Sequence, residues 1–169
     1  PAPPAGYPTE ILSFAAGWFL YDKIPLKNVP PMEGVTAPLH LTLGPGGDRT
    51  LLLDLYSPAN IDSARPGLLL FYGGGWRGGE KEQLRTYAQA FAKHGYVVAT
   101  PQYRLKEAGR WPNSVQDAKC AVRWMRAHAA ENHVDPDRIG VMGNSAGAYL
   151  ALMVGYTADV PEFEGDGGW

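Results

Sequence analysis

The fold is constrained most by an alternation of short apolar segments with segments of helical periodicity. Residues 67–72 form an uninterrupted apolar run, which is typical of a strand buried on both faces of a parallel sheet. Further strands are predicted at residues 40–43, 50–56, 96–100 and 138–143, and helices at residues 82–94, 114–131 and 145–156. Strands that alternate with helices predict an α/β fold, with a mostly parallel sheet flanked by helices.

Two of the predicted helices carry signals at their ends. Gly95 follows the helix at residues 82–94, where a left-handed C-terminal cap is expected. Ser114 opens the next helix and Asp117 lies three residues later, which resembles a capping box. These signals predict that one helix ends before Gly95 and that the next begins at Ser114.

Composition excludes several classes of protein. The 169 residues suggest one domain, or one domain and a small piece, and 45% apolar with 19% charged residues is a globular composition. A net charge of −2 gives no excess of positive charge that would attract nucleic acid or an anionic membrane. The single Cys excludes an intrachain disulfide framework and a multi-cysteine metal site, and no apolar run approaches the roughly 18 residues of a membrane span. We therefore expect no nucleic acid, membrane or metal partner.

The first chemical signal is Gly143-Asn144-Ser145-Ala146-Gly147, between a predicted strand and a predicted helix. A sharp turn of this kind strains the serine backbone and raises its hydroxyl above the sheet edge. The flanking glycines leave room for neighbouring backbone, and the helix N-terminus presents free N–H groups and a positive dipole end. The alternative is a glycine-rich helix start in which the serine serves as N-cap.

The second signal is Tyr72-Gly73-Gly74-Gly75-Trp76, directly after the buried strand. Consecutive glycines let backbone amides turn toward a ligand oxygen. The same segment matches the dinucleotide-binding pattern G-x-G-x-x-G, but no acidic residue ends the next strand. A Walker loop fails as well, because no Lys followed by Ser or Thr comes after the last glycine.

Together the two segments resemble the α/β-hydrolase superfamily, in its hormone-sensitive-lipase-like and acyl-carbohydrate esterase branch. That family places a glycine loop about seventy residues before its nucleophile, and here 70 positions separate Gly75 from Ser145. Residues 103–105, 111–112 and 135–139 are similar to the family as well. The resemblance covers residues 38–157.

The resemblance implies a role for each motif residue and requires no cofactor. Ser145 is similar to the acyl-forming nucleophile, and the N–H groups of Gly74, Gly75 and Ala146 look like the oxyanion hole. Tyr72 replaces a histidine that braces the loop in the family, so a phenol would be the brace here. The remaining motif residues are expected to shape the two turns: Gly73, Trp76, Gly143 and Gly147.

The base and the acid of the expected triad are missing. In this family the order is Ser, then Asp or Glu, then His, but all four histidines precede Ser145: His40, His94, His128 and His133. The acidic residues after Ser145 follow it too closely and are interpreted as a solvated loop: Asp159, Glu162, Glu164 and Asp166. Ending here would also leave the strand at 138–143 as an exposed apolar edge.

We therefore expect the N-terminal portion of a larger hydrolase, in three segments. Residues 1–37 are a Pro- and aromatic-rich segment with aromatic side chains clustered at residues 11–21, and residues 38–157 are the N-terminal part of the hydrolase domain. Residues 158–169 are an acidic, glycine-rich loop at a cleavage site, a disordered stretch or the end of the fragment. The C-terminal remainder would be a second chain or a missing segment that supplies the Asp and the His.

The predicted function is that of a serine carboxylic-ester hydrolase that acts through an acyl-enzyme on Ser145. The resemblance favours acetylated or feruloylated carbohydrates as substrates, and Trp18, Trp76 and Trp111 could stack on sugar or aryl groups. The alternatives are a small-molecule hydrolase such as an arylformamidase, or an incomplete fragment that binds a ligand or partner without turnover. A secreted or periplasmic location is expected, with the cytoplasm as the alternative.

Overall fold

The structure is a computed structural model that describes residues 29–169. The sheet and all of the elements below belong to the unit Pro31–Trp169. The aromatic cluster predicted at residues 11–21 lies outside the described residues, and the three predicted segment boundaries stay predictions. Within the described part of the chain, no helix has the length and apolar character needed to cross a membrane.

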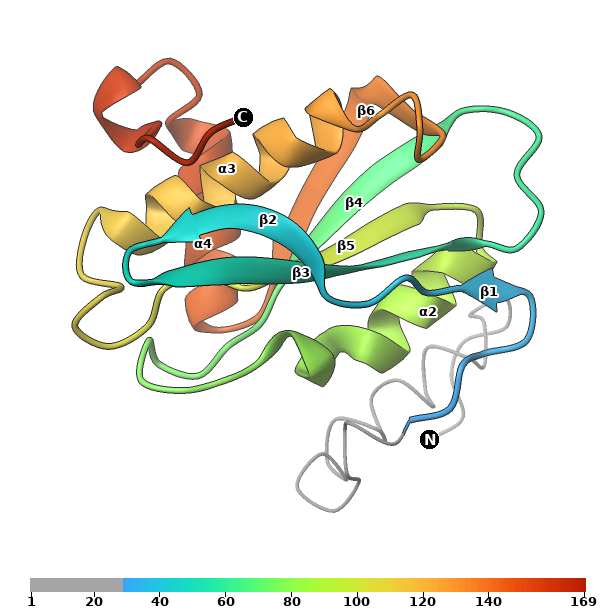
Figure 1. Cartoon of the computed structure of the whole chain (residues 1–169), viewed down its shortest axis with the longest axis horizontal. Coiled ribbons are helices and arrows are strands. Elements are labelled where there is room, and N and C mark those ends of the chain that lie inside the picture. The colour runs from blue at the N-terminus through green and yellow to red at the C-terminus, as the bar shows by residue number, and fades with distance from the viewer. Residues whose placement is uncertain (1–28) are drawn as a thin grey trace, which may run out of the picture. The chain divides into compact units, whose positions relative to one another are not determined.

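A mixed sheet forms the centre of the described unit (Figure 1). Its order is β1-β3-β5-β4-β6, and β2 pairs with β3 outside this path. The strands β5, β4 and β6 are parallel, whereas β3 runs antiparallel to β1, β2 and β5. The strand bounds are β1 Val35–Thr36, β2 Leu41–Gly46, β3 Arg49–Pro58, β4 Arg65–Phe71, β5 Val97–Pro101 and β6 Val134–Gly143.

Helices cover both faces of the sheet, with α2 on one face and α3 and α4 on the other (Figure 1). The helix bounds are α2 Arg85–Lys93, α3 Asn113–Ala127 and α4 Ala146–Tyr156, with 3-10 turns η3 Lys81–Leu84 and η4 Pro161–Phe163. The prediction of an α/β fold with helices on a sheet is therefore confirmed.

The core lies where the parallel strands meet the apolar sides of these helices. All five residues of β5 are buried, as is the end of β4 at Leu69, Leu70 and Phe71. Small side chains such as Ala88 and Ala118 let the helices pack closely on the sheet. Because both faces of β4 and β5 are covered, an uninterrupted apolar sequence is the pattern that such strands need.

Three predicted boundaries need correction. The helix predicted at residues 82–94 begins as the 3-10 turn η3 and becomes α-helical at Arg85. The helix predicted to reach residue 131 ends at Ala127, because the chain continues in turns through residues 128–133. The strand predicted at residues 138–143 begins earlier, at Val134, and its pairing with β4 shifts between Pro66 and Gly67.

One end signal is confirmed and the other is wrong. Gly95 has φ +92° and its N–H donates to Ala92 O (2.9 Å), as a left-handed cap should. The capping box is wrong, because Ser114 lies inside α3 and the N-cap, Pro112, makes no side-chain bond. The Asp117 carboxylate instead accepts hydrogen bonds from Arg104, including one from its backbone N–H (2.7 Å).

The segment after α4 is held by specific contacts rather than being wholly solvated. Glu164 forms ion pairs with Lys119 and Arg123 of α3, which contradicts its interpretation as a solvated loop residue. The Cys120 thiol is buried and donates to Gly167 O (3.2 Å). The Trp169 indole N–H donates to Leu43 O of β2. These bonds draw residues 164–169 across α3 toward β2.

Candidate active site

The two glycine segments meet because their strands are neighbours. The strands β4 and β6 are parallel and paired, with Phe71 opposite Gly143 in the register. Each strand ends at that pair, so the loop that follows β4 and the turn that follows β6 leave the sheet side by side. The carboxyl edge of a parallel sheet is the usual place for a ligand site in α/β proteins.

Ser145 lies on a strained turn between β6 and α4. Its backbone has φ 51° and ψ −120°, its side chain is exposed, and α4 begins with the next residue. A positive φ is uncommon for a residue other than glycine and costs on the order of 1–3 kcal/mol. Ser145 makes no capping hydrogen bond to α4, so the interpretation of this residue as a simple N-cap is not supported.

The first turn of α4 directs a free amide toward the same region. The N–H of Gly147 donates to Asn144 O (2.8 Å), and those of Ala148 and Tyr149 donate to Ser145 O (3.0 and 3.2 Å). Within residues 29–169 the Ala146 N–H has no backbone acceptor. A helix N-terminus with an unpaired N–H group favours a negative charge in front of it.

Asn144 joins the glycine loop to the serine turn. Its Oδ1 accepts a hydrogen bond from the Gly73 N–H (3.0 Å), and its own N–H donates to Phe71 O (3.3 Å). The approach is close, because a Cβ on Gly73 would lie 3.1 Å from the Ser145 Cβ. The structure thus brings together two segments that are separated by about seventy residues in the sequence.

The remainder of the loop is a tight turn with two open amides. The N–H groups of Arg77 and Gly78 donate to Gly74 O (3.1 and 3.2 Å) and close the turn. Gly75 has φ 58° and open space where a Cβ would stand. In the described part of the chain, no backbone carbonyl accepts a bond from the N–H of Gly74 or Gly75. Both N–H groups can therefore donate hydrogen bonds to a new oxygen ligand.

Tyr72 packs beneath the loop as a neutral side chain. Its ring is 1% exposed and stacks on Tyr103, with ring centroids 4.4 Å apart. The Tyr103 hydroxyl donates to Tyr72 O (2.6 Å), which fixes the backbone where the loop starts. Burial raises the pKa of Tyr72 to about 12, although the Tyr103 backbone acts to lower it. The phenol is placed to support the loop rather than to transfer protons near neutral pH.

Exposed aromatic side chains continue outward from the loop. Trp76, with φ 59°, meets Tyr149 edge to face at 5.6 Å, and Trp111 meets Tyr149 at 6.5 Å. Phe163 meets Trp111 edge to face, with ring centroids 5.0 Å apart. Tyr149 was missed in the sequence, although a residue four positions after Ser145 must lie above it on the same helix face.

These features agree with the comparisons to known proteins. The BD-FAE family model matches residues 53–168, which is more than half of the chain. The chain belongs to the BD-FAE family. The predicted resemblance to α/β-hydrolases of the hormone-sensitive-lipase-like type is thereby confirmed.

Relatives of this BD-FAE chain are esterases. It is 31% identical to the probable carboxylic ester hydrolase LipM of Mycobacterium tuberculosis over 115 residues, which are 66% of this chain and 27% of LipM. It is 32% identical to esterase LipC of the same organism, over 72% of this chain and 30% of LipC. The chain thus spans less than a third of the length of these two curated relatives.

Solved structures support the same fold. A bacterial heroin esterase superposes with a TM-score of 0.69 at 29% identity, over 88% of this chain and 46% of that one. Esterase B of Lactobacillus rhamnosis superposes with a TM-score of 0.73 at 26% identity, over 92% of this chain and 50% of that one. The BD-FAE chain therefore corresponds to about half of a complete esterase structure.

The structure does not bring a histidine to Ser145. His94 and His128 bond through Nδ1 to carbonyls of their own helix ends (2.8 Å each), and His40 lies beside Asp54 at the start of β2. His133 follows α3 with φ 54°. No hydrogen bond or ion pair joins any of these four to Ser145 in residues 29–169, and no group of three or more His, Cys, Asp or Glu side chains there could hold a metal ion.

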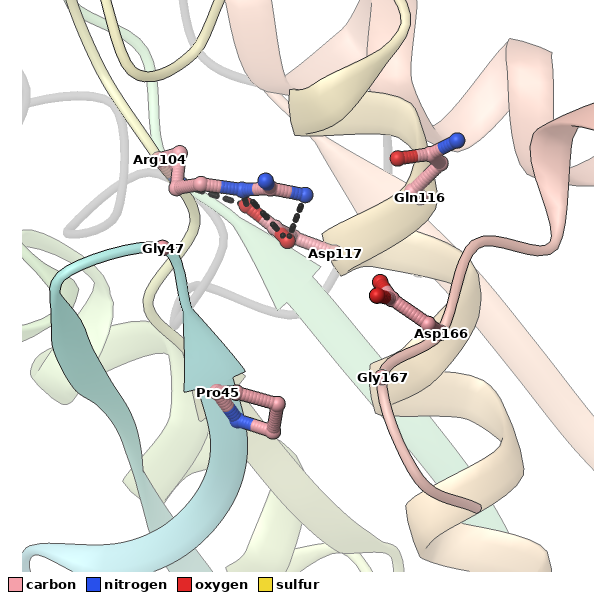
Figure 2. A pocket seen from close by; sticks show the side chains of 7 residues that line it. All are labelled: Pro45, Gly47, Arg104, Gln116, Asp117, Asp166 and Gly167. Atoms are coloured by element: carbon pink, nitrogen blue, oxygen red, sulfur yellow. Dashed lines mark hydrogen bonds and ion pairs between the residues drawn. The ribbon is translucent and has the colours of Figure 1, made fainter.

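A separate pocket of about 190 Å³ lies between the β2–β3 turn and α3 (Figure 2). Figure 2 shows Arg104 and Asp117 facing each other inside it, with an Nη2–Oδ1 distance of 2.8 Å. Burial raises the pKa of Asp117 although the bonds from Arg104 act to lower it. Because the buried Asp117 is paired with the partly buried Arg104, the pocket is best explained as the setting of an ion pair that joins the segment after β5 to α3.

Proposed function

We propose that this chain carries the nucleophile and the oxyanion donors of a serine carboxylic-ester hydrolase. The observation that carries the proposal is the strained Ser145 at the end of β6, with a glycine loop bonded to its neighbour Asn144. The names of the relatives, which are carboxylic ester hydrolases and esterases, support the same activity.

In this mechanism the Ser145 Oγ attacks the ester carbonyl carbon and its proton passes to a base. The carbonyl oxygen becomes negatively charged and is held by the N–H groups of Gly74, Gly75 and Ala146, each worth about 3 kcal/mol of barrier. The tetrahedral intermediate collapses, and the alcohol leaves with the proton from the base. Water then attacks the acyl-enzyme in the same way and releases the acid.

We infer that the base and its acid lie outside these 169 residues, in a C-terminal remainder. None of the four histidines is bonded to Ser145. In addition, β6 pairs with β4 alone among the described strands, and apolar side chains on β6 and α4 are exposed: Met142 (48%), Leu152 (57%) and Tyr156 (85%). An apolar surface of this kind beside an open strand edge suits contact with more of the same domain.

We propose acetylated or feruloylated carbohydrates as the substrates, and a secreted or periplasmic location to match. Trp76, Tyr149 and Trp111 form a row of exposed aromatic rings that starts in the glycine loop. Flat apolar ring faces suit the stacking of a sugar ring or an aryl acyl group. The strained φ of 59° at Trp76 supports a use for this side chain at the site.

The nucleophile is tested by Ser145→Ala in the chain joined by its C-terminal remainder, with Ser63→Ala on an exposed loop as the matched control. Hydrolysis of p-nitrophenyl acetate should fall on the order of 10⁴-fold or more in Ser145→Ala, and labelling by a fluorophosphonate probe should disappear. Ser63→Ala should match the wild type. Activity that survives in Ser145→Ala would show that the nucleophile is elsewhere.

The substrate class is tested by relative rates on methyl ferulate and N-formylkynurenine. A higher kcat/KM on the ferulate supports the acyl-carbohydrate assignment, and the reverse order identifies a small-molecule hydrolase such as an arylformamidase. An incomplete, ligand-binding fragment is the third outcome. In that case Ser145 hardly reacts with the probe even in the chain joined by its remainder.

A further inference from the structure

A buried charge cluster lies immediately after the glycine loop. Lys81 begins η3 with its side chain 1% exposed, and its Nζ donates to Asp54 Oδ1 and Glu82 Oε1, both at 2.7 Å. Asp54, in the middle of β3, is fully buried and also accepts a bond from the His40 N–H (2.8 Å). Burial acts to raise the pKa of Glu82, but the bonds from Lys81 lower it, so this carboxylate stays ionised.

The ion pair between Lys81 and Asp54 costs much desolvation energy for the position of one short turn, η3. Removing an ammonium and a carboxylate from water costs several kcal/mol per ion, and apolar side chains of similar size often serve stability as well. The pair instead fixes position, because short charge-assisted hydrogen bonds hold both side chains in one geometry. Such a device is expected where the location of the chain, rather than its stability alone, matters.

The location that Lys81 fixes is the exit of the glycine loop. The entrance and the exit touch, since a Cβ on Gly79 would lie 2.4 Å from Gly73 O and 2.7 Å from the Tyr72 ring. The entrance is held by β4 and by Asn144. At the exit, Lys81 comes two residues after Gly79 and is bound to β3, a strand separated from β4 by β5. The loop is therefore clamped between two points of the sheet.

We propose that Lys81, through Asp54, is a positioning residue for the glycine loop and sets the placement of the Gly74 and Gly75 amides. This inference rests on the proposed function, because it assigns those amides to the oxyanion. The side chain of Lys81 does not reach the substrate. It acts through the backbone of residues 73–80, and its removal lets the loop shift relative to Ser145.

Lys81→Met tests the proposal, since it keeps the length of the side chain and removes the ammonium. In the protein that shows Ser145-dependent hydrolysis, kcat should fall about 100-fold, the effect of a displacement near 1 Å. KM should change little, because the oxyanion contacts form in the transition state. Lys119→Met is the matched control: Lys119 is also buried, with its side chain 6% exposed, and is bonded to Glu164, but it lies on α3 away from the loop.

A second measurement uses the 169-residue chain and does not depend on turnover. The Gly73 N–H is protected by its bond to Asn144, so its hydrogen exchange reports on the seating of the loop. We expect exchange at Gly73 to be about tenfold faster in Lys81→Met than in Lys119→Met. If Lys81→Met does not fold, Lys81→Gln keeps a donor for Asp54 without the charge and should lower kcat about tenfold.

The outcomes separate this proposal from the proposed function. A wild-type kcat in the folded Lys81 variant, an unchanged Gly73 exchange rate, or an equal loss of kcat in Lys119→Met overturns the positioning role. Activity that survives in Ser145→Ala overturns the proposed function instead. Loss of kcat confined to the Lys81 variants, with recovery in Lys81→Arg, supports the proposal.

Discussion

The serine turn and Gly75 of the glycine loop both depend on glycine, but for different physical reasons. In the turn, a Cβ on Gly147 would lie 2.0 Å from Phe71 O, and one on Gly143 would lie 2.3 Å from Gly147 O. In the loop, Gly75 has open space around it and needs only a φ of +58°. The turn uses glycine to bring backbones together, whereas the loop at Gly75 uses it to aim an amide outward. Two similar glycine patterns therefore have different causes: close packing of backbone in the serine turn, and a positive φ at Gly75.

The packing constraint is broken most severely by Gly147→Ala. The new methyl group meets backbone atoms of β4, which cannot move without separating the turn from the sheet. We expect a loss of roughly 4 kcal/mol or more in the free energy of unfolding, or no cooperative transition. Urea denaturation followed by circular dichroism measures it.

Gly155→Ala is the matched control, because it lies in the same helix with nothing within 4 Å of its Cβ position. There alanine should raise stability by about 0.5–1 kcal/mol through its better helix propensity. Equal stabilities for the two variants would contradict the packing argument.

Beneath the loop, Tyr72 makes a pH-dependent contribution. Its pKa is raised from 10.0 to about 12 by burial, so its neutral form stabilises the folded state fully below pH 10, and this stabilisation is lost as the pH rises toward 12. Between pH 9 and pH 12 the wild type should lose about 2 kcal/mol more than Tyr72→Phe, which lacks the ionisable group.

Unfolding by urea at a series of alkaline pH values measures this difference. Tyr156→Phe, at a ring that is 85% exposed, should follow the wild-type curve. Parallel curves for Tyr72→Phe and the wild type would show that the phenol of Tyr72 ionises as readily in the folded chain as in the unfolded one.

The conformational constraint is tested by Gly75→Ala. An alanine in the left-handed region costs roughly 1–2 kcal/mol, with no steric clash to add to it. Gly34→Ala is the matched control, because Gly34 has φ +80° and equally open space but lies in the turn before β1. We expect equal losses of stability from both and a loss of hydrolysis from Gly75→Ala alone. A Gly75→Ala variant as active as Gly34→Ala would argue against an oxyanion role.

The smallest effect is expected where the two regions are joined. Asn144→Ala removes the acceptor of the Gly73 N–H and should cost about 1 kcal/mol of stability. Asn144→Asp keeps an acceptor and should retain most of it. Thermal unfolding of the three proteins checks this order, and a stable Asn144→Ala would mean that the loop is seated without the bond.

Much of the fold could be predicted from the sequence, because it depends on patterns local to each segment. The apolar run of β4 follows from burial on both faces of the sheet, and Gly95 follows from the positive φ at the end of α2. Both requirements can be read from the adjacent residues. The end of α3 could not be predicted in this way, since residues 128–131 have no strong helix-breaking residue. Asp117, predicted to belong to a capping box, is instead bonded to Arg104, which precedes α3. Only the folded chain shows this pairing.

In the candidate site, too, some residues could be predicted from the sequence and others could not. Ser145 and the glycine loop stand out because strained turns require particular residue types in a fixed order. Lys81, by contrast, carries no signal in the sequence, because its partner Asp54 lies on a strand 27 positions earlier. Glu164 was misread for the same reason, since its cationic partners are on α3. An ion pair between residues far apart in the sequence leaves no pattern in the residues around either partner.

The helix behind Ser145 has a further consequence for how the site would respond to solution conditions. Helix α4, Ala146–Tyr156, contains no Asp, Glu, Lys, Arg or His. The positive potential at its N-terminus therefore arises from peptide dipoles alone and does not change as carboxylates or imidazoles take up protons. The response of hydrolysis to acid would then report on the base that receives the Ser145 proton, undistorted by the helix that faces the oxyanion.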